Sequence, residues 1–179
     1  VAVDNQKIRT KQMVLIALMT AVTCVLGPLS IPLPFSPVPI SLTNFAIFLA
    51  IFVLGMKSGT ISFIIYLLLG AVGVPVFSSF RGGFQVLGGY LIGFIFLALI
   101  MGFALDHFDR KLVPTIIGMI IGMAVCYAFG TVWLAKLLSL SFKEGLMMGV
   151  IPYLPGDAAK IIIAAIVGPK LYGATQKIR

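Results

Sequence analysis

The stretch Pro152-Tyr153-Leu154-Pro155-Gly156-Asp157-Ala158-Ala159-Lys160 places two opposite charges at the start of an apolar, helix-competent run, Ala158 to Val167. Positions i and i+3 share one face of a helix, so Asp157 and Lys160 present a hydrogen-bond acceptor and a cationic donor side by side. Ionisable groups in a lipid-embedded segment cost about 2.5 to 3.5 kcal/mol each on insertion scales. The pair therefore indicates a functional site.

Asp157 has a second interpretation as a helix N-cap, because Pro-Gly-Asp before an apolar run is typical of a helix start. Capping gives no reason for a lysine one turn inside the helix, so Lys160 favours the functional interpretation. The sequence by itself leaves both roles open for Asp157.

The composition is that of an integral membrane protein. Of the 179 residues, 60% are hydrophobic and 10% are charged, with a mean hydropathy of +1.16, whereas soluble domains carry about 25% charged residues. The net charge of +8 would indicate nucleic-acid binding if it formed a patch, but the basic residues lie mostly at the chain ends and in short loops. Cys24 and Cys126 lie in apolar runs without metal-ligand spacing, so we expect packing roles and no metal site.

We predict an all-α membrane protein with six transmembrane helices in a single domain, residues 1–179. The predicted spans are about 13–29, 40–56, 59–74, 90–105, 112–138 and 155–172. A tight turn at 55–59 separates the second span from the third, and residues 139–154 form a loop or a short interfacial helix. Because no Ala-x-Ala-like site follows the first apolar run, we interpret it as a transmembrane helix and not as a signal peptide.

The loop between the first two spans is rich in proline. Residues 27–39 contain Pro28, Pro32, Pro34, Pro37 and Pro39, and this density removes amide donors and blocks helix formation. The segment is nevertheless apolar and uncharged. We predict an extended loop that packs against the protein near the outer interface, where it is a candidate lid.

The loop at residues 75–90 is rich in glycine. Paired glycines, among them Gly83, stand beside Phe77, Arg81 and Tyr90, which is typical of a compact loop whose backbone approaches a ligand closely. A phosphate site is disfavoured because the loop lacks a Gly-Lys-Ser/Thr ending and dinucleotide-binding spacing. The alternative is a plain turn with one exposed arginine.

The basic residues predict the topology. Six spans put both termini on one side, which then holds Lys7, Arg9, Lys11, Lys57, Arg110, Lys111, Lys170, Lys177 and Arg179, against Arg81, Lys136 and Lys143 on the other. By the positive-inside rule both termini are cytoplasmic. Asp157 then begins the sixth helix at the outer face, on the same side as the two unusual loops, so we predict an outward-facing pocket for a small molecule.

Three other classes of protein fit the residues less well. An intramembrane enzyme needs a nucleophile with a base, paired acids or metal ligands within the spans, and one membrane acid with a lone loop histidine does not supply them. A channel needs a polar path, but four of the six predicted spans carry no charge. A scaffold protein leaves Asp157 and Lys160 unexplained. Ligand binding by the purified protein would separate capture from scaffolding.

Several motifs resemble those of the BioY family, the biotin-binding S components of energy-coupling factor transporters. They run in order along nearly the whole chain: Pro37-Val38-Pro39-Ile40, Tyr66-Leu67-Leu68-Leu69-Gly70-Ala71-Val72-Gly73-Val74-Pro75-Val76-Phe77, Gly88-Gly89-Tyr90-Leu91-Ile92-Gly93-Phe94 and Pro155-Gly156-Asp157-Ala158-Ala159-Lys160. The chain departs from the family pattern in the glycine loop, Phe84 to Tyr90, and at Thr43, where a glutamine is common.

The resemblance implies a high-affinity biotin-binding subunit with an S-component-like bundle, no enzymatic activity and no cofactor. Biotin carries a ureido group with two N–H donors and one carbonyl acceptor, which Asp157 and Lys160 match, and a carboxylate, which Arg81, loop amides or Lys160 could bind. Aromatic side chains would cover the rings. The substrate-binding residues implied are Asp157, Lys160, Arg81, Asn44, Phe77, Gly83 and Tyr90.

The resemblance also implies partners and a location. The chain has no nucleotide-binding motif, so uptake would need a transmembrane coupling protein, EcfT, and two ATPase subunits. The face of the first helix that carries Ala17 and Ala21 would contact the coupling protein, since small residues four apart let helices approach closely in lipid. We expect a multi-pass protein of the bacterial plasma membrane, with no nucleic-acid partner.

Overall fold

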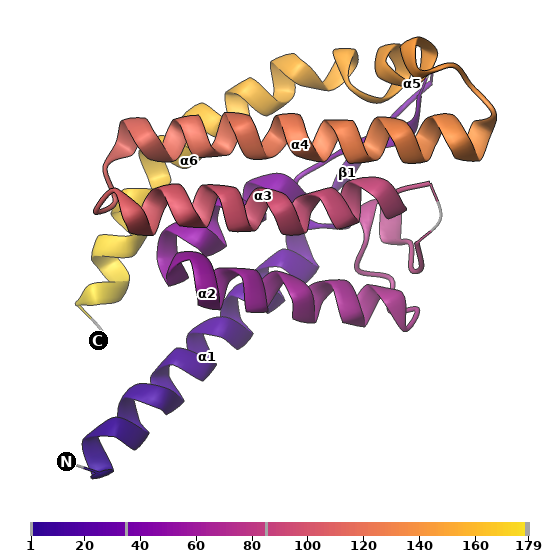
Figure 1. The fold of residues 1–179 in the computed structure, drawn as a ribbon. Coiled ribbons are helices and arrows are strands. Elements are labelled where there is room, and N and C mark those ends of the chain that lie inside the picture. Colours follow the sequence, from indigo (N-terminus) through magenta and orange to yellow (C-terminus); the bar gives the residue numbers. More distant parts are fainter. Residues whose placement is uncertain (1, 35, 85, 178–179) are drawn as a thin grey trace.

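The computed structural model describes residues 2–34, 36–84 and 86–177, which form a bundle of helices with one small hairpin (Figure 1). In order, the elements are α1 (Ala2–Leu26), β1 (Ser30–Leu33), β2 (Ser36–Ser41), α2 (Thr43–Ala71), η1 (Ser78–Phe80), α3 (Gly88–His107), α4 (Leu112–Leu138), α5 (Phe142–Gly149), η2 (Ile151–Tyr153) and α6 (Leu154–Gln176). α3 packs between α4 and α2, and α2 in turn contacts α1 and α6.

The helices are apolar enough for a membrane, as predicted. Among the described residues, four helical stretches have the length and hydropathy to cross a bilayer, namely Thr43–Ala71, Gly88–His107, Leu112–Leu138 and Phe142–Gln176. The apolar part of α1, Thr10–Leu26, is shorter. The short helix expected within residues 139–154 is α5, which begins with a capping box between Ser141 and Glu144.

α2 changes direction at Gly55, inside the turn predicted at 55–59. Gly55 has φ 79° and ψ −178°, a backbone conformation that is essentially restricted to glycine. The kink divides α2 into two arms, residues 43–54 and 56–71. The arms pack closely, since a Cβ on Gly59 would come within 2.6 Å of the Ile51 side chain.

The backbone groups freed by this kink find partners at the end of α3 and in the turn that follows it. The Met56 amide donates to Asp106 Oδ2 at 2.8 Å, and the Arg110 guanidinium donates to the Phe52 carbonyl at 2.6 Å. The same guanidinium lies 3.7 Å from the ring centroid of Tyr172, on α6. The charged turn therefore joins α2, α3, α4 and α6 at one end of the bundle.

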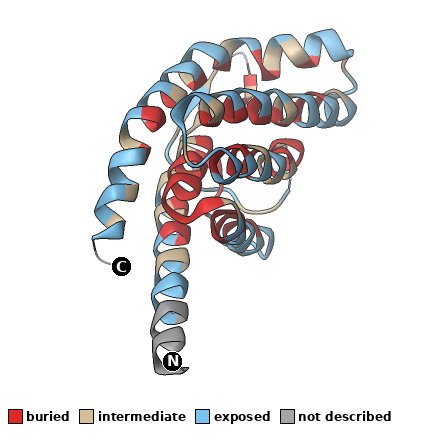
Figure 2. Cartoon of the chain, turned by 60° about the vertical axis from the view of Figure 1, so that its left-hand side comes forward, coloured by how far each residue is buried: buried red, intermediate tan, exposed pale blue. Residues whose placement is uncertain are grey.

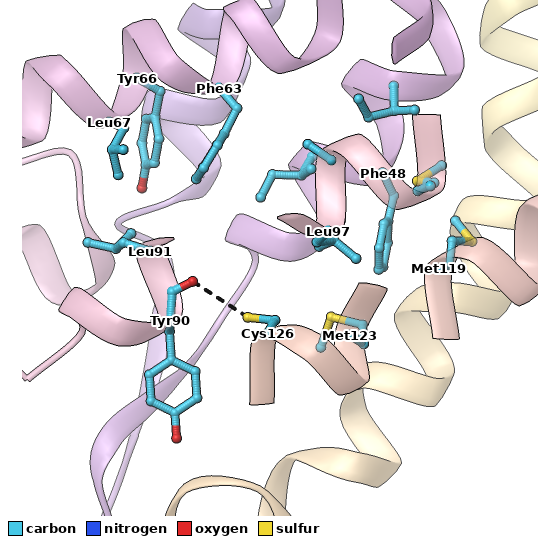
Figure 3. Packing of buried hydrophobic residues seen from close by; sticks show 14 of the residues in the cluster. Phe48, Phe63, Tyr66, Leu67, Tyr90, Leu91, Leu97, Met119, Met123 and Cys126 are labelled. Carbon is cyan, nitrogen blue, oxygen red and sulfur yellow. Dashed lines mark hydrogen bonds between the residues drawn. The ribbon is translucent and has the colours of Figure 1, made fainter. Parts of the chain in front are cut away.

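The core lies where α2, α3 and α4 meet, and buried residues concentrate on the facing sides of these helices (Figure 2). Figure 3 shows Phe63 beside Tyr66, and the Cys126 thiol directed at the Tyr90 carbonyl, to which it donates at 3.5 Å. α4 approaches α3 closely because Gly122 is small, and a Cβ there would come within 2.6 Å of Leu97. Cys126 therefore packs in the core, as predicted.

The proline-rich segment differs from the prediction, because it forms an antiparallel hairpin and not a loop. β1 and β2 pair with Ser30 opposite Ser41 and Ile31 opposite Ile40. Proline is compatible with edge strands, and in a two-stranded sheet each strand is an edge whose outward amides need no partner. The expectation of an all-α protein is therefore wrong at this segment, although the rest of the described chain is mostly helical.

The hairpin lies at the opposite end of the bundle from the first turns of α1 and the end of α6. These two helix ends point to the same side of the molecule (Figure 1). The hairpin, η1 and α5 lie at the other end (Figure 1). The two unusual loops and the start of α6 are therefore neighbours, as the sequence predicts.

We predict that Gly55→Ala destabilises the protein, because alanine is strained at this φ and ψ by about 1 to 3 kcal/mol. Its Cβ would also lie 3.1 Å from Asp106 Oδ1. Thermal unfolding of the detergent-solubilised protein measures the effect. Gly173→Ala, where a Cβ meets nothing within 4 Å, is the control and should not lower the midpoint. Equal midpoints for the Gly55→Ala variant and the wild type would contradict the strain.

Candidate functional site

A cavity of about 60 Å³ lies between the hairpin, the loop before α3, and the helices α3, α4 and α6. Segments far apart in the sequence meet here, which agrees with the predicted convergence of the two loops and the start of the sixth helix. The lining residues are Val38, Pro39, Ser41, Asn44, Ser78, Leu87, Tyr90, Phe94, Met123, Cys126, Tyr127, Gly149, Tyr153, Asp157 and Lys160.

Asp157 and Lys160 form an ion pair in this lining, with 2.9 Å between Lys160 Nζ and Asp157 Oδ1. The residues are only 7% and 9% exposed. Their separation of three positions on α6 puts them on one face, as predicted. A buried pair of this kind stabilises a fold little or not at all unless its remaining hydrogen-bonding capacity is also satisfied.

The start of α2 satisfies much of that capacity. Asn44 Nδ2 donates to Asp157 Oδ1 at 2.7 Å, while Lys160 Nζ donates to Asn44 Oδ1 at 3.0 Å and to the Ser41 carbonyl at 2.5 Å. Asn44 therefore bridges both charges. The cluster offers a fixed anionic acceptor beside a fixed cationic donor, which suits a neutral polar ligand that both donates and accepts hydrogen bonds.

Asp157 is not the N-cap of α6. The helix begins at Leu154, Tyr153 occupies the cap position, and no side chain caps this end. Asp157 lies inside the first turn, and its carboxylate faces the cluster. The capping interpretation is therefore wrong, and the functional one remains.

Tyr127, on α4, is a member of the cluster that the sequence did not predict. Its hydroxyl donates to Asp157 Oδ2. Within an apolar span it was one aromatic residue among many, and nothing local marks it. The one available signal was that a phenol hydroxyl in lipid needs a partner, and the predicted bundle offered Asp157 as an acceptor.

Tyr90 and Tyr153 hold two walls of the cavity. The Tyr90 hydroxyl donates to the Gly149 carbonyl at 2.8 Å. The Tyr153 hydroxyl lies 2.6 Å from Ser36 Oγ and donates to the Val38 carbonyl. Tyr153 thereby ties the hairpin to the segment before α6. Tyr90 was predicted as a site residue, whereas Tyr153 was missed although it stands within the stretch that defines the site.

Three of the predicted site residues do not line this cavity. Phe77 is fully buried, with its ring 5.5 Å from that of Tyr66. Gly83 has φ 80°, and its amide donates to the Gly70 carbonyl at 2.8 Å. Arg81 is exposed. All three belong to the loop that supplies Ser78 and Leu87 to the lining, so they lie near the site without touching the cavity in this conformation.

The cavity is smaller than a ligand site. Pockets for small molecules usually measure about 300 to 1,000 Å³, against about 60 Å³ here. A small-molecule ligand of ordinary size therefore needs part of the lining to move. As for metals, the described residues contain no group of three histidine, cysteine or acidic side chains placed to hold an ion.

The chain is similar in sequence and in structure to known proteins. Residues 4–177 match the model of the BioY family. Similar proteins include the biotin transporter BioY of Rhizobium etli, 38% identical over 89% of this chain and 91% of the relative, and that of Thermotoga maritima, 34% identical over 90% and 95%. A crystal structure of the S component for biotin from an ECF-type ABC transporter aligns with a TM-score of 0.83 at 31% identity, over 93% of this chain and 92% of that one.

Proposed function

The chain belongs to the BioY family, and we propose that it captures biotin as the S component of an ECF-type transporter. It is a transport protein and not an enzyme, in line with relatives that are named transporters. The observation that carries the proposal is the buried cluster of Asp157, Lys160 and Asn44 at the cavity. This is a costly arrangement, and a polar ligand explains why the chain maintains it.

The ureido group of biotin matches this cluster. One of its N–H groups can donate to Asp157 Oδ2, and its carbonyl can accept from Lys160 in place of the Ser41 carbonyl, because all three ammonium protons of Lys160 already have acceptors. Tyr90 would cover a ring face from α3. For the biotin carboxylate, Arg81 is the candidate at the exposed rim, with Lys160 as the alternative, and Phe77 and Gly83 would shape the loop that carries Arg81.

Entry of biotin requires the cavity to enlarge, and the hairpin is the proposed moving part. It is short, has two edges and is joined to the segment before α6 through Tyr153. A few polar contacts of this kind are worth about 0.5 to 1.5 kcal/mol each. The hairpin can therefore open without unfolding the helices.

We predict that the isolated protein binds biotin and that Asp157→Asn weakens binding by roughly tenfold or more. The variant removes the negative charge at nearly constant volume, and charge-assisted hydrogen bonds are about twice as strong as neutral ones. Calorimetric titration measures the affinity, and Trp133, which packs on Gly88 and Gly89 near the cavity, offers a fluorescence signal.

Asp109→Asn is the matched control, because Asp109 is exposed in the turn between α3 and α4; it should leave the affinity unchanged. A folded wild-type protein that does not bind biotin would contradict the proposed function. Wild-type affinity in Asp157→Asn would remove the Asp157 charge from the site.

We further propose six membrane spans with both termini in the cytoplasm of a bacterium. The spans would be α1, the two arms of α2, α3, α4 and α6. The positive-inside rule and the position of the start of α1 and the end of α6 on one side of the bundle support this topology (Figure 1). The cavity would then face outward, beside the hairpin.

The topology predicts opposite accessibility of two engineered cysteines in a background without Cys24 and Cys126. Phe80→Cys should react with a membrane-impermeant maleimide on intact cells, whereas Lys177→Cys should react only after permeabilisation. Both positions are exposed in the structure. Labelling of both cysteines on intact cells, or of neither, would contradict the six-span arrangement.

For uptake, the chain would assemble with a coupling protein, EcfT, and two ATPase subunits. An apolar groove of about 690 Å³ between α1 and the second arm of α2 supports a helix-binding role, and Ala17 and Ala21 are part of its lining. Both alanines are exposed. Small residues at such positions permit close helix packing in lipid.

We predict that Ala17→Trp with Ala21→Trp abolishes biotin uptake by cells and copurification with the coupling protein, but leaves biotin binding by the isolated subunit intact. The added rings would fill the groove, while the cavity lies elsewhere in the bundle. Ala128→Trp, at an exposed position on α4, is the control. Normal uptake by the double variant would show that this face is not the interface; loss of binding together with uptake would show that the alanines serve the fold of the subunit.

A further inference from the structure

The carboxylate of Asp157 has its hydrogen bonds distributed unevenly. Among the described residues, Oδ1 accepts from Asn44 and Lys160, whereas Oδ2 accepts from Tyr127. A carboxylate offers about four acceptor positions. Oδ1 is therefore fully used, and the position left for a ligand N–H is on Oδ2, beside the tyrosine hydroxyl.

Tyr127 is also one of three residues that lie between the cavity and a second space. A groove of about 230 Å³ lies between α4 and α6, and Met123, Tyr127 and Asp157 line both the groove and the cavity. The rest of the groove is apolar: Ile120, Ala124, Leu154, Ala158 and Ile161. The groove exists because α6 packs mainly on α2 and contacts α4 little.

Resting on the proposed function, we propose that Tyr127 is a positioning and specificity-determining residue for biotin. Its hydroxyl holds Asp157 so that Oδ2 presents its remaining acceptor position to a ureido N–H. Its ring closes the cavity toward the groove, so the site rejects ligands that carry a substituent on that nitrogen.

Both roles follow from the chemistry of the phenol. The hydroxyl donates its single proton to Oδ2, so it fixes the carboxylate plane and still leaves one acceptor position on that oxygen. A phenylalanine would keep the ring and lose this restraint. A small side chain would lose both the ring and the hydrogen bond to Asp157. It would also join the cavity and the groove, whose volumes together approach the size usual for ligand sites.

The first test is a double-mutant cycle on biotin affinity. Tyr127→Phe should weaken biotin binding by roughly ten- to a hundredfold, which is the change in affinity expected from the loss of one hydrogen bond to a charged group. In the Asp157→Asn background the same change should have little further effect, because Tyr127 acts through the carboxylate. Tyr172→Phe, which removes a hydroxyl near the opposite end of α6, should bind as the wild type.

The second test changes the ligand. Biotin alkylated with a propyl group on one or the other ureido nitrogen should bind the wild-type protein poorly. For at least one of the two isomers, Tyr127→Ala should reduce the difference in affinity between biotin and its propyl derivative by tenfold or more, because the propyl group can enter the groove. Tyr127→Leu is the second variant if alanine prevents folding.

The outcomes separate this inference from the proposed function. A wild-type protein that does not bind biotin overturns both. If the wild type binds biotin, two results overturn the positioning role. One is an unchanged biotin affinity in Tyr127→Phe, and the other is that Tyr127→Phe weakens binding by the same factor in the wild type and in the Asp157→Asn variant. The specificity role is overturned if, for both propyl isomers, the ratio of the affinity for biotin to the affinity for the isomer is the same in the wild type and in the variant with a small side chain at position 127.

Discussion

The buried ion pair of Asp157 and Lys160 is the constraint on which the rest of the site depends. Removing an ion from water costs several kcal/mol even after relaxation, and the attraction between the partners repays this only with good geometry and further hydrogen bonds. The chain meets the requirement with three segments, since Asn44 and the Ser41 carbonyl come from the start of α2 and the end of the hairpin, and Tyr127 from α4. The ion pair thus dictates which segments must meet.

The same network connects the ion pair to the hairpin. Lys160 holds the carbonyl of Ser41, the last residue of β2, and Tyr153 holds Ser36 and Val38 within that strand. A ligand that takes hydrogen bonds from Lys160 competes with a contact to the hairpin. In the proposed function, ligand occupancy and hairpin position would therefore be linked through one side chain, and the small cavity would be the closed form of the site.

At the opposite end of the bundle, buried backbone groups also need hydrogen-bond partners, as the buried charges do in the site. In lipid, each freed amide and carbonyl needs an internal partner. The kink at Gly55 frees such groups, and they are satisfied by Asp106 from the end of α3 and by Arg110 from the turn that follows. Arg110 also packs on Tyr172, so this polar turn positions the far end of the helix that carries the ion pair.

The sequence by itself determined the membrane-compatible composition, the approximate positions of the helices, the turn at Gly55, and the pairing of Asp157 with Lys160, because each depends on local composition or on the periodicity of one helix. The exact helix bounds differ from the predicted spans: α1 ends at Leu26, and residues 40–41 belong to β2. The tertiary structure decided that the proline-rich segment is a hairpin, that Asp157 is not a cap, that Tyr127 and Tyr153 join the site, and that Arg81, Phe77 and Gly83 lie off the cavity. These features depend on partners far apart in the chain: Tyr127 is 30 residues from Asp157, and Tyr153 is 117 from Ser36. A hydroxyl in an apolar span requires a partner, but only the packing of the helices selects which one it finds.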